Sequence, residues 1–221
     1  MISEQLTEIY RLLFDQLGPQ HWWPGQSRFE IITGAILTQN TSWPNVEKAI
    51  TNLKTADLLT SEKVYRLEIT ALAELIRPAG YFNIKAKRLK NFLNWLFDNY
   101  DGRLTNLENV GTDRLRAELL AIKGIGPETA DSILLYAFNR PAFVVDAYTA
   151  RIATRHRLIE PAAGYEQLRE LFQFNLPPDT QLFNEYHALL VRVGKNWCRP
   201  KAKCAGCPLE GLPHNPNPEY F

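Results

Sequence analysis

The stretch Leu119–Arg155 constrains the fold of this 221-residue chain more than any other part of it. Gly124 and Gly126 form a turn between two apolar helical segments, and the second segment begins at Pro127. A short β-prone run then ends on Asp146, which begins another helix. Glycines let the backbone approach a ligand closely, and a helix N-terminus directs N–H groups at an anion. The stretch therefore predicts a phosphate-binding turn, with an acid that faces the same ligand.

Apolar residues at three- and four-residue spacing recur along most of the chain, which indicates amphipathic helices. Almost no segment shows the two-residue alternation of a strand, and there is no internal repeat or low-complexity tract. We therefore expect an all-α protein. The expected helices are 3–17, 29–38, 44–54, 61–67, 70–76, 84–100, 112–121, 127–138, 146–156, 165–174 and 180–193.

The composition limits the cellular setting of the protein. Hydrophobic residues make up 45% of the chain and charged residues 22%, as in an ordinary soluble globular protein. No apolar run approaches the roughly 18 residues of a membrane span, and Met1–Gln5 lacks the basic start of a signal peptide. We expect a cytoplasmic protein without a membrane partner, associated with the nucleoid if it binds DNA.

The net charge of +1 gives no overall evidence for a polyanionic partner. A nucleic-acid site would have to come from local clusters of basic residues, although such a cluster is usually just a solvated face. Two clusters are present, namely Lys85, Lys87, Arg88 and Lys90, and Lys195, Arg199, Lys201 and Lys203.

The turn at Gly124 and Gly126 has two readings. Two glycines in a short turn, without other signals, usually form only a plain connection between helices. Here apolar residues stand where they would close a helical hairpin, and Pro127 occupies a position where a missing N–H costs nothing. Lys123 adds a positive charge beside the turn. These features indicate a helix-hairpin-helix motif in which the glycine amides and Lys123 contact a phosphate.

Together with Asp146, this motif resembles the helix-hairpin-helix DNA glycosylase superfamily, typified by endonuclease III. The resemblance implies a two-lobed all-α fold. One lobe would be a helical barrel over residues 25–127 that ends in the hairpin. The other would combine residues 1–24 and 128–221 and carry a cysteine-containing loop. The implied partner is duplex DNA with a damaged base, bound by a monomer.

Asp146 is the expected catalytic residue, because the matching aspartate is essential in that superfamily. It also suits a helix N-cap, and an N-cap carboxylate keeps a lone pair for chemistry. Breaking a base–sugar bond creates positive character at C1′, which a nearby carboxylate stabilises while it deprotonates an attacking water.

Glu128 departs from the superfamily pattern. Members that also cleave the strand carry a nucleophilic lysine at this place in the motif. A carboxylate cannot form a Schiff base. The resemblance therefore implies a monofunctional glycosylase in base excision repair, a hydrolase without AP-lyase activity.

Aromatic residues narrow the substrate class. Trp22, Trp23 and Pro24 precede the helix at 29–38, and Trp43 follows it. A single tryptophan is usually part of a core. With the later RPAGYFNIKAKRL and KGIGPE segments, however, the pattern resembles the short bacterial 3-methyladenine DNA glycosylases. That resemblance makes the four residues a base pocket, in which electron-rich rings attract a cationic alkylated purine.

Two polar or aromatic turn residues are expected to contact the opened duplex. A flipped base leaves a gap that a side chain can fill. Gln39, in the turn after the helix at 29–38, matches the gap-filling residue of the superfamily. Tyr81 is a candidate wedge on the opposite strand, or a residue of ordinary loop packing.

All three cysteines, Cys198, Cys204 and Cys207, lie in one short C-terminal stretch. An odd, clustered set in a cytosolic chain favours a metal or cluster site over disulfides. The spacing resembles the iron–sulfur loop of endonuclease III, where four cysteines hold a 4Fe-4S cluster. Pro213 stands where the fourth cysteine would fall, and His214 follows as a candidate ligand. A 4Fe-4S cluster, a zinc ion bound by three cysteines and a histidine, and an empty loop all stay open.

Two other functions stay open as well. The chain could be an endonuclease III-like glycosylase for oxidised or mismatched pyrimidines. It could also be a non-catalytic helix-hairpin-helix DNA-binding module in which Asp146 is only a helix cap.

Overall fold

The structure is a computed structural model and describes residues 1–217. Within these residues the regular secondary structure is entirely helical, which confirms the expected all-α class. No helix among them is long and apolar enough to cross a membrane. The α-helices are α1 Ile2–Leu17, α2 Arg28–Leu37, α3 Trp43–Thr55, α4 Ser61–Arg66, α5 Ile69–Leu75, α6 Phe82–Tyr100, α7 Thr112–Ala121, α8 Pro127–Ser132, α9 Ala147–Arg155, α10 Tyr165–Gln173 and α11 Thr180–Asn196.

Three shorter helical segments complete the description. Two are 3₁₀ turns, η1 at Arg77–Ala79 and η2 at Leu104–Leu107. The third, η3 at Ile133–Ala137, is a π-helical turn that continues α8. The single helix expected over 127–138 is therefore an α-helical turn followed by a π-helical one.

The chain divides into two compact units. The first, here called the hairpin unit, is Trp23–Arg140. The second, here called the terminal unit, combines Met1–Trp22 with the chain from Pro141 onward. The expected lobe ended at residue 127, whereas α8 and η3 belong to the hairpin unit because both pack against α2.

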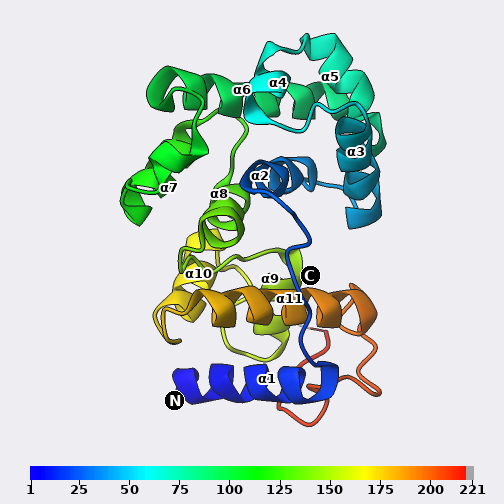
Figure 1. Cartoon of the computed structure of the whole chain (residues 1–221). Coiled ribbons are helices and arrows are strands. Elements are labelled where there is room, and N and C mark those ends of the chain that lie inside the picture. The colour runs from blue at the N-terminus through cyan, green and yellow to red at the C-terminus, as the bar shows by residue number, and fades with distance from the viewer. Residues whose placement is uncertain (218–221) are drawn as a thin grey trace. The chain divides into compact units, whose positions relative to one another are not determined.

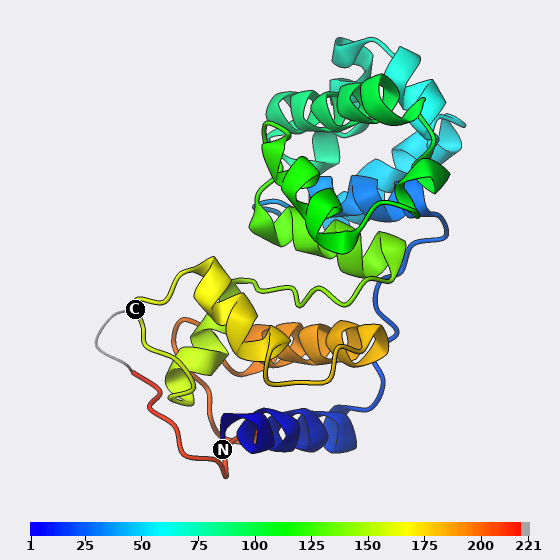
Figure 2. The same cartoon turned by 90° about the vertical axis from the view of Figure 1, so that its left-hand side faces the viewer.

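Helix α2 forms the centre of the hairpin unit and contacts α3, α6, α8 and η3 (Figures 1 and 2). The Ser27 side chain begins the helix by accepting a hydrogen bond from the Glu30 backbone N–H, an N-cap contact. Eight of its ten residues are buried, among them the polar Glu30 and Thr33, in keeping with a sequence that is mostly apolar. Turns at the ends of such a buried helix are held in place by the packing of the helix itself.

The terminal unit is built on α11, which packs against both α1 and α9 (Figure 1). Its core is aromatic, and the rings of Phe143 and Phe172 stack with centroids 4.3 Å apart. The β-prone run that contains Phe143 is extended but pairs with no strand among the described residues. The Gln173 side chain replaces a strand partner, since it accepts from the Phe143 N–H at 2.8 Å and donates to the Pro141 carbonyl at 2.8 Å.

Candidate functional site

The turn between α7 and α8 has the geometry of a tight helical hairpin. The Ile125 N–H donates to the Ile122 carbonyl at 3.0 Å, and both isoleucine side chains are buried. Gly124 has φ +98°, and a Cβ there would lie 2.4 Å from Cγ of Arg88. Glycine is therefore required at 124 for backbone conformation and for space. Lys123 and Gly126 are exposed, as a phosphate contact requires.

A buried ion pair that the sequence analysis missed joins the two helices of the hairpin. Arg116 of α7 donates to both carboxylate oxygens of Asp131 in α8, at 2.7 and 3.0 Å. The Asp131 side chain is completely buried. This bidentate contact fixes the angle at which the two helices meet at the turn.

Asp146 is the N-cap of α9 in the terminal unit. Its Oδ1 accepts hydrogen bonds from the Thr149 N–H at 2.8 Å and from the Thr149 hydroxyl at 3.0 Å. Its side chain keeps 13% of its surface exposed. The carboxylate is therefore oriented by the helix N-terminus and can still be reached by a water molecule.

His187 of α11 faces this carboxylate and was not anticipated. Its Nε2 lies 3.7 Å from Asp146 Oδ2, which makes an ion pair when the ring is protonated. Burial alone would raise the pKa of Asp146, but His187 and Thr149 outweigh it and lower that pKa below its ordinary value. Asp146 is thus held as a carboxylate. In the sequence His187 is a lone histidine on an apolar helix, which gives no signal of this role.

Gln39 lies at the centre of a hydrogen-bonded network in the hairpin unit. Its amide nitrogen donates to the Gly124 carbonyl at 3.2 Å and to the Thr129 hydroxyl at 2.8 Å. Its amide oxygen accepts a hydrogen bond from Arg88 of α6. The structure therefore brings Gln39 and the hairpin glycine together.

Tyr81 occupies an exposed turn in the same unit. Its side chain is 68% exposed, and it adopts a left-handed backbone conformation with φ +45° as the N-cap of α6. Few non-glycine residues adopt this conformation. An aromatic ring presented to solvent in this way is available to a partner, which weakens the alternative of loop packing.

The aromatic residues expected in a base pocket fall in both units. Trp23 contacts Trp43 edge to face, with ring centroids 5.1 Å apart, and contacts Tyr136 of η3 at 5.1 Å. Pro24, the residue after Trp23, is exposed, whereas Trp22 belongs to the terminal unit. Trp23 also packs on α2, because a Cβ on Gly34 would lie 3.0 Å from its ring. Tyr136 is a member of the cluster that the sequence analysis missed.

The first basic cluster is not a uniform phosphate-binding face. Lys85 is buried, and Lys90 donates to the backbone carbonyls of Val64 and Tyr65 at 2.9 and 2.7 Å. Only Lys87 is exposed, because Arg88 is half-buried against Gln39. The periodicity of α6 therefore turns most of this cluster inward.

The three cysteines and His214 line one small cavity in the terminal unit. Arg155 organises the loop around it by donating to Cys198 Sγ at 3.2 Å and to two backbone carbonyls of residues 199 and 200. Burial raises the pKa of the Cys207 thiol. Among residues 1–217, no three His, Cys, Asp or Glu side chains form a group that could hold a metal ion.

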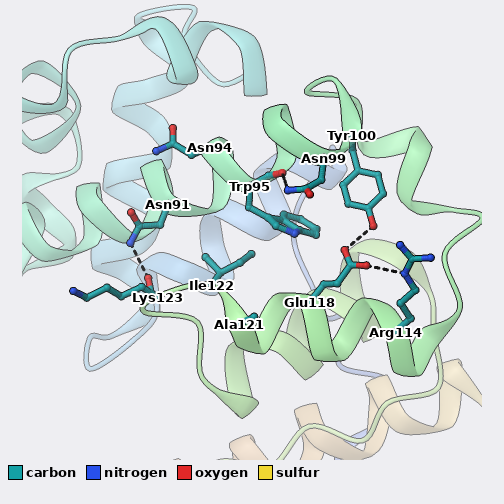
Figure 3. Close-up of a pocket in the computed structure, with 10 residues that line it drawn as sticks. All are labelled: Asn91, Asn94, Trp95, Asn99, Tyr100, Arg114, Glu118, Ala121, Ile122 and Lys123. Carbon is teal, nitrogen blue, oxygen red and sulfur yellow. Dashed lines mark hydrogen bonds and ion pairs between the residues drawn. The ribbon is translucent and has the colours of Figure 1, made fainter.

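A cavity of ≈ 410 Å³ lies between α6 and α7, next to the hairpin (Figure 3). Glu118 is the best-connected residue in its wall, since its carboxylate accepts from the Tyr100 hydroxyl at 2.6 Å and from Arg114 Nε at 2.8 Å. These hydrogen bonds, that of Tyr100 first, lower the pKa of Glu118. Asn91 donates to the Lys123 carbonyl at 2.8 Å and so ties α6 to the hairpin. Of the predicted site residues, only Lys123 borders this cavity.

Known proteins similar in sequence point to DNA repair. A family model described as "HhH-GPD superfamily base excision DNA repair protein" matches residues 33–178. A Methanocaldococcus jannaschii protein, named as a candidate DNA repair glycosylase, is 51% identical over 209 residues, which are 94% of each chain. Endonuclease III of Sulfolobus acidocaldarius is 30% identical over 181 residues, covering 81% of this chain and 78% of that protein.

Solved structures agree with this family. The H. pylori 3-methyladenine DNA glycosylase bound to 1,N6-ethenoadenine is 31% identical, with a TM-score of 0.75 over 88% of this chain and 97% of that one. An endonuclease III–DNA complex has a TM-score of 0.82 over 97% and 96% of the two chains, and at 20% identity it shows the shared fold. The family model spans well over half of the chain. The protein therefore belongs to the HhH-GPD superfamily of base excision DNA repair proteins and is a DNA glycosylase of that family.

Proposed function

We propose that the protein hydrolyses the N-glycosidic bond of alkylated purines, of the 3-methyladenine type, in bases flipped from duplex DNA. The observation that carries the proposal is the largely buried but still accessible carboxylate of Asp146, kept ionised by Thr149 and His187. Oδ1 accepts two hydrogen bonds from Thr149, so we assign the contact with the reacting atoms to Oδ2, the oxygen that faces His187.

The reaction needs little besides this carboxylate. Water attacks C1′ while the glycosidic bond breaks, and the bonding electrons leave with the base. Asp146 stabilises the positive character at C1′ and accepts the proton of the water. A purine methylated at N3 is cationic before cleavage and leaves as a neutral base, so no general acid has to protonate it. The hydrolytic route also suits Glu128, which cannot form a Schiff base.

The choice of an alkylated purine rests on the aromatic cluster and on similarity. Trp23, Trp43 and Tyr136 offer electron-rich rings, which attract a cationic base by cation–π interaction. Pro24 and Trp22 are further proposed contacts of the base. The 31% identity to the H. pylori 3-methyladenine DNA glycosylase supports the same substrate class.

The hairpin and the turns that carry Gln39 and Tyr81 are proposed to bind the duplex. The amides of Gly124 and Gly126, with Lys123, would contact one phosphate group. Gln39 would fill the gap that the flipped base leaves, and Tyr81 would enter between bases of the opposite strand. We expect the protein to act on DNA as a monomer.

We also propose that the cysteine loop holds a 4Fe-4S cluster, which would draw together thiols that do not form a metal-binding group in the described residues of this structure. The thiols of Cys198, Cys204 and Cys207 and the imidazole of His214 border one cavity, and soft thiolates suit iron–sulfur ligation. The cluster would cross-link the loop and present Lys201 and Lys203, both exposed, to the DNA backbone. A zinc ion in place of the cluster is an alternative that metal analysis separates.

A glycosylase assay tests the activity. Duplexes that contain 3-methyladenine or thymine glycol are incubated with the protein and the released bases are quantified. We expect release of methyladenine, whereas release of thymine glycol alone would contradict the proposal that alkylated purines are the substrate. Asp146→Asn should abolish turnover while binding of duplex DNA persists. Unchanged turnover in that variant would remove Asp146 from the mechanism and favour a DNA-binding module.

A further inference from the structure

Lys85 of α6 is a buried cation that has no part in the proposed chemistry. Its side chain is 1% exposed. Its Nζ donates to the Leu37 carbonyl at 2.7 Å and to the Ala79 carbonyl at 2.7 Å. Burying an ammonium group costs free energy unless its hydrogen bonds are satisfied. The position of these two carbonyls in the fold therefore indicates what the ammonium group does.

The two carbonyls end two different helices. Leu37 is the last residue of α2, and Ala79 is the last residue of η1. Carbonyls at a helix C-terminus lack intrahelical partners and carry partial negative charge, which an ammonium group satisfies. One cation thus closes two helix ends that are 42 positions apart in the chain.

Each of these helix ends leads directly into a turn with a proposed DNA-contacting residue. Gln39 follows Leu37 by two positions, and Tyr81 follows Ala79 by two positions. The Lys85 backbone is itself tied to the second turn, because its N–H donates to the Tyr81 carbonyl at 3.0 Å. Lys85 therefore connects the two turns through its side chain and its main chain.

We propose that Lys85 is a positioning residue that holds the turns of Gln39 and Tyr81 in one fixed arrangement, so that both side chains enter an opened duplex together. The inference rests on the proposed roles of these two residues. Arg88, one helical turn further along α6, donates to Gln39 itself, so the same face of α6 contacts this turn twice. Burial first, and the nearby charge of Arg88 second, lower the pKa of Lys85 to about 8, and the group stays cationic at neutral pH.

The test compares Lys85→Met with a matched control, Lys90→Met. Lys90 lies on the same helix and also donates to backbone carbonyls, but these belong to residues 64, 65 and 67 at the end of α4, outside either turn. Both variants lose a cation held by carbonyls. The measured quantity is the ratio of affinities for a duplex with a tetrahydrofuran abasic-site analogue and for the same duplex undamaged.

We expect Lys85→Met to lower this ratio on the order of 10-fold or more, since small misplacements of positioned groups have large effects. Lys90→Met should leave the ratio unchanged, even where it lowers the melting temperature equally. Equal ratios in the two variants would overturn the inference. If Lys85→Met does not fold, Lys85→Gln, which keeps an amide donor, replaces it with the same expected direction.

A double-mutant cycle separates positioning from a merely structural role. In a Gln39→Ala/Tyr81→Ala background, Lys85→Met should have no further effect on the ratio, because the residues it positions are gone. An additive loss would show that Lys85 acts by another route and would refute the inference. The abasic-site ratio does not depend on base excision. A wild-type protein that releases no methyladenine but prefers the duplex with the abasic-site analogue would refute the proposed substrate and leave the role of Lys85 intact.

Discussion

The carboxylate of Asp146 combines two roles, the cap of a helix N-terminus and the proposed catalytic group. As an N-cap it accepts two hydrogen bonds from Thr149 through one oxygen. Its other oxygen faces His187 at 3.7 Å. The partners hold the charged form despite burial, because they lower the pKa more than desolvation raises it. The cap thus orients the same group that the proposed hydrolysis uses.

His187→Phe should move the acid limb of the activity profile to higher pH, by on the order of one pH unit. The folded-state pKa of Asp146 is depressed, so the ionised form and the stability it contributes are present above the ordinary value of 3.8 and lost as pH falls through the folded pKa. Removing His187 leaves only the Thr149 hydrogen bonds to oppose the effect of burial, so the pKa of Asp146 rises. Single-turnover excision from about pH 3 to pH 8 measures the shift, and an unmoved acid limb would exclude this coupling.

Gly124 and Gly126 lie in the same turn, but only Gly124 has a conformation and surroundings that exclude a side chain. Gly124→Ala should destabilise the fold by more than about 1 kcal/mol, because alanine is strained at a positive φ and its Cβ would meet Arg88. At Gly126, φ is −94° and a Cβ meets nothing within 4 Å. Gly126→Ala should therefore stay within about 1 kcal/mol of the wild type. Urea unfolding of both variants checks this, and equal destabilisation would contradict it.

At the scale of elements, the hairpin depends on a contact between its two helices as well as on its turn. The Arg116–Asp131 pair is bidentate, and Asp131 is 0% exposed. Buried charges of this kind are costly to leave alone. The angle between α7 and α8, and with it the direction of the amides at the turn, is therefore coupled to one ion pair.

Asp131→Ala should lower the free energy of unfolding by about 3–5 kcal/mol, because it removes a buried carboxylate that binds the largely buried Arg116 guanidinium through two hydrogen bonds. The exposed pair Arg66–Glu62 in α4 serves as the control, and Glu62→Ala should cost less than about 1 kcal/mol. Replacing both partners, as Arg116→Met with Asp131→Leu, should recover much of the loss. A double variant as unstable as Asp131→Ala would argue against this account.

At the scale of the whole molecule, the proposed tasks are divided between the units. The hairpin, Gln39 and Tyr81 belong to Trp23–Arg140. Asp146, His187 and the cysteine loop belong to the terminal unit. The residues proposed to open the duplex and the residue proposed to do the chemistry therefore belong to separate cores, while Lys201 and Lys203 add proposed phosphate contacts on the terminal unit.

The absence of a lysine nucleophile at position 128 predicts the final product. A methylated duplex treated with the protein should retain an intact abasic strand that breaks only after alkali. Borohydride should trap no covalent protein–DNA complex, because Glu128 cannot form a Schiff base. Denaturing gels with endonuclease III as the positive control measure both outcomes. A trapped complex would require another amine to act as nucleophile.

The cysteine loop predicts a metal content. Protein purified without oxygen should contain roughly four iron atoms per chain and absorb visible light. Cys204→Ser and His214→Ala should lower the iron content, while Cys204→Ser leaves the hairpin unit folded. Stoichiometric zinc would favour the alternative ligand set, and protein without any metal would refute the cluster.

Local patterns in the sequence were enough to predict the all-α class, most helix positions and the hairpin. Those features follow from residues close in the chain, such as the glycine turn before Pro127. The N-cap position of Asp146 could be predicted for the same reason, because an acid before a helix is a local signal, whereas its catalytic role rests on the resemblance to the superfamily. The bounds of the units and the interruption of the helix after Ser132 were not visible, since they depend on packing against α2.

The contacts that hold these features in place depend on the folded chain. His187 reaches Asp146 across 41 positions, and Lys85 reaches Leu37 across 48. In the sequence, His187 is an isolated histidine and Lys85 is one lysine of a basic run. Periodicity records which face of a helix is buried, but not which distant backbone or side chain lies opposite that face. Folding alone brings an ammonium group to two helix ends and an imidazole to a carboxylate.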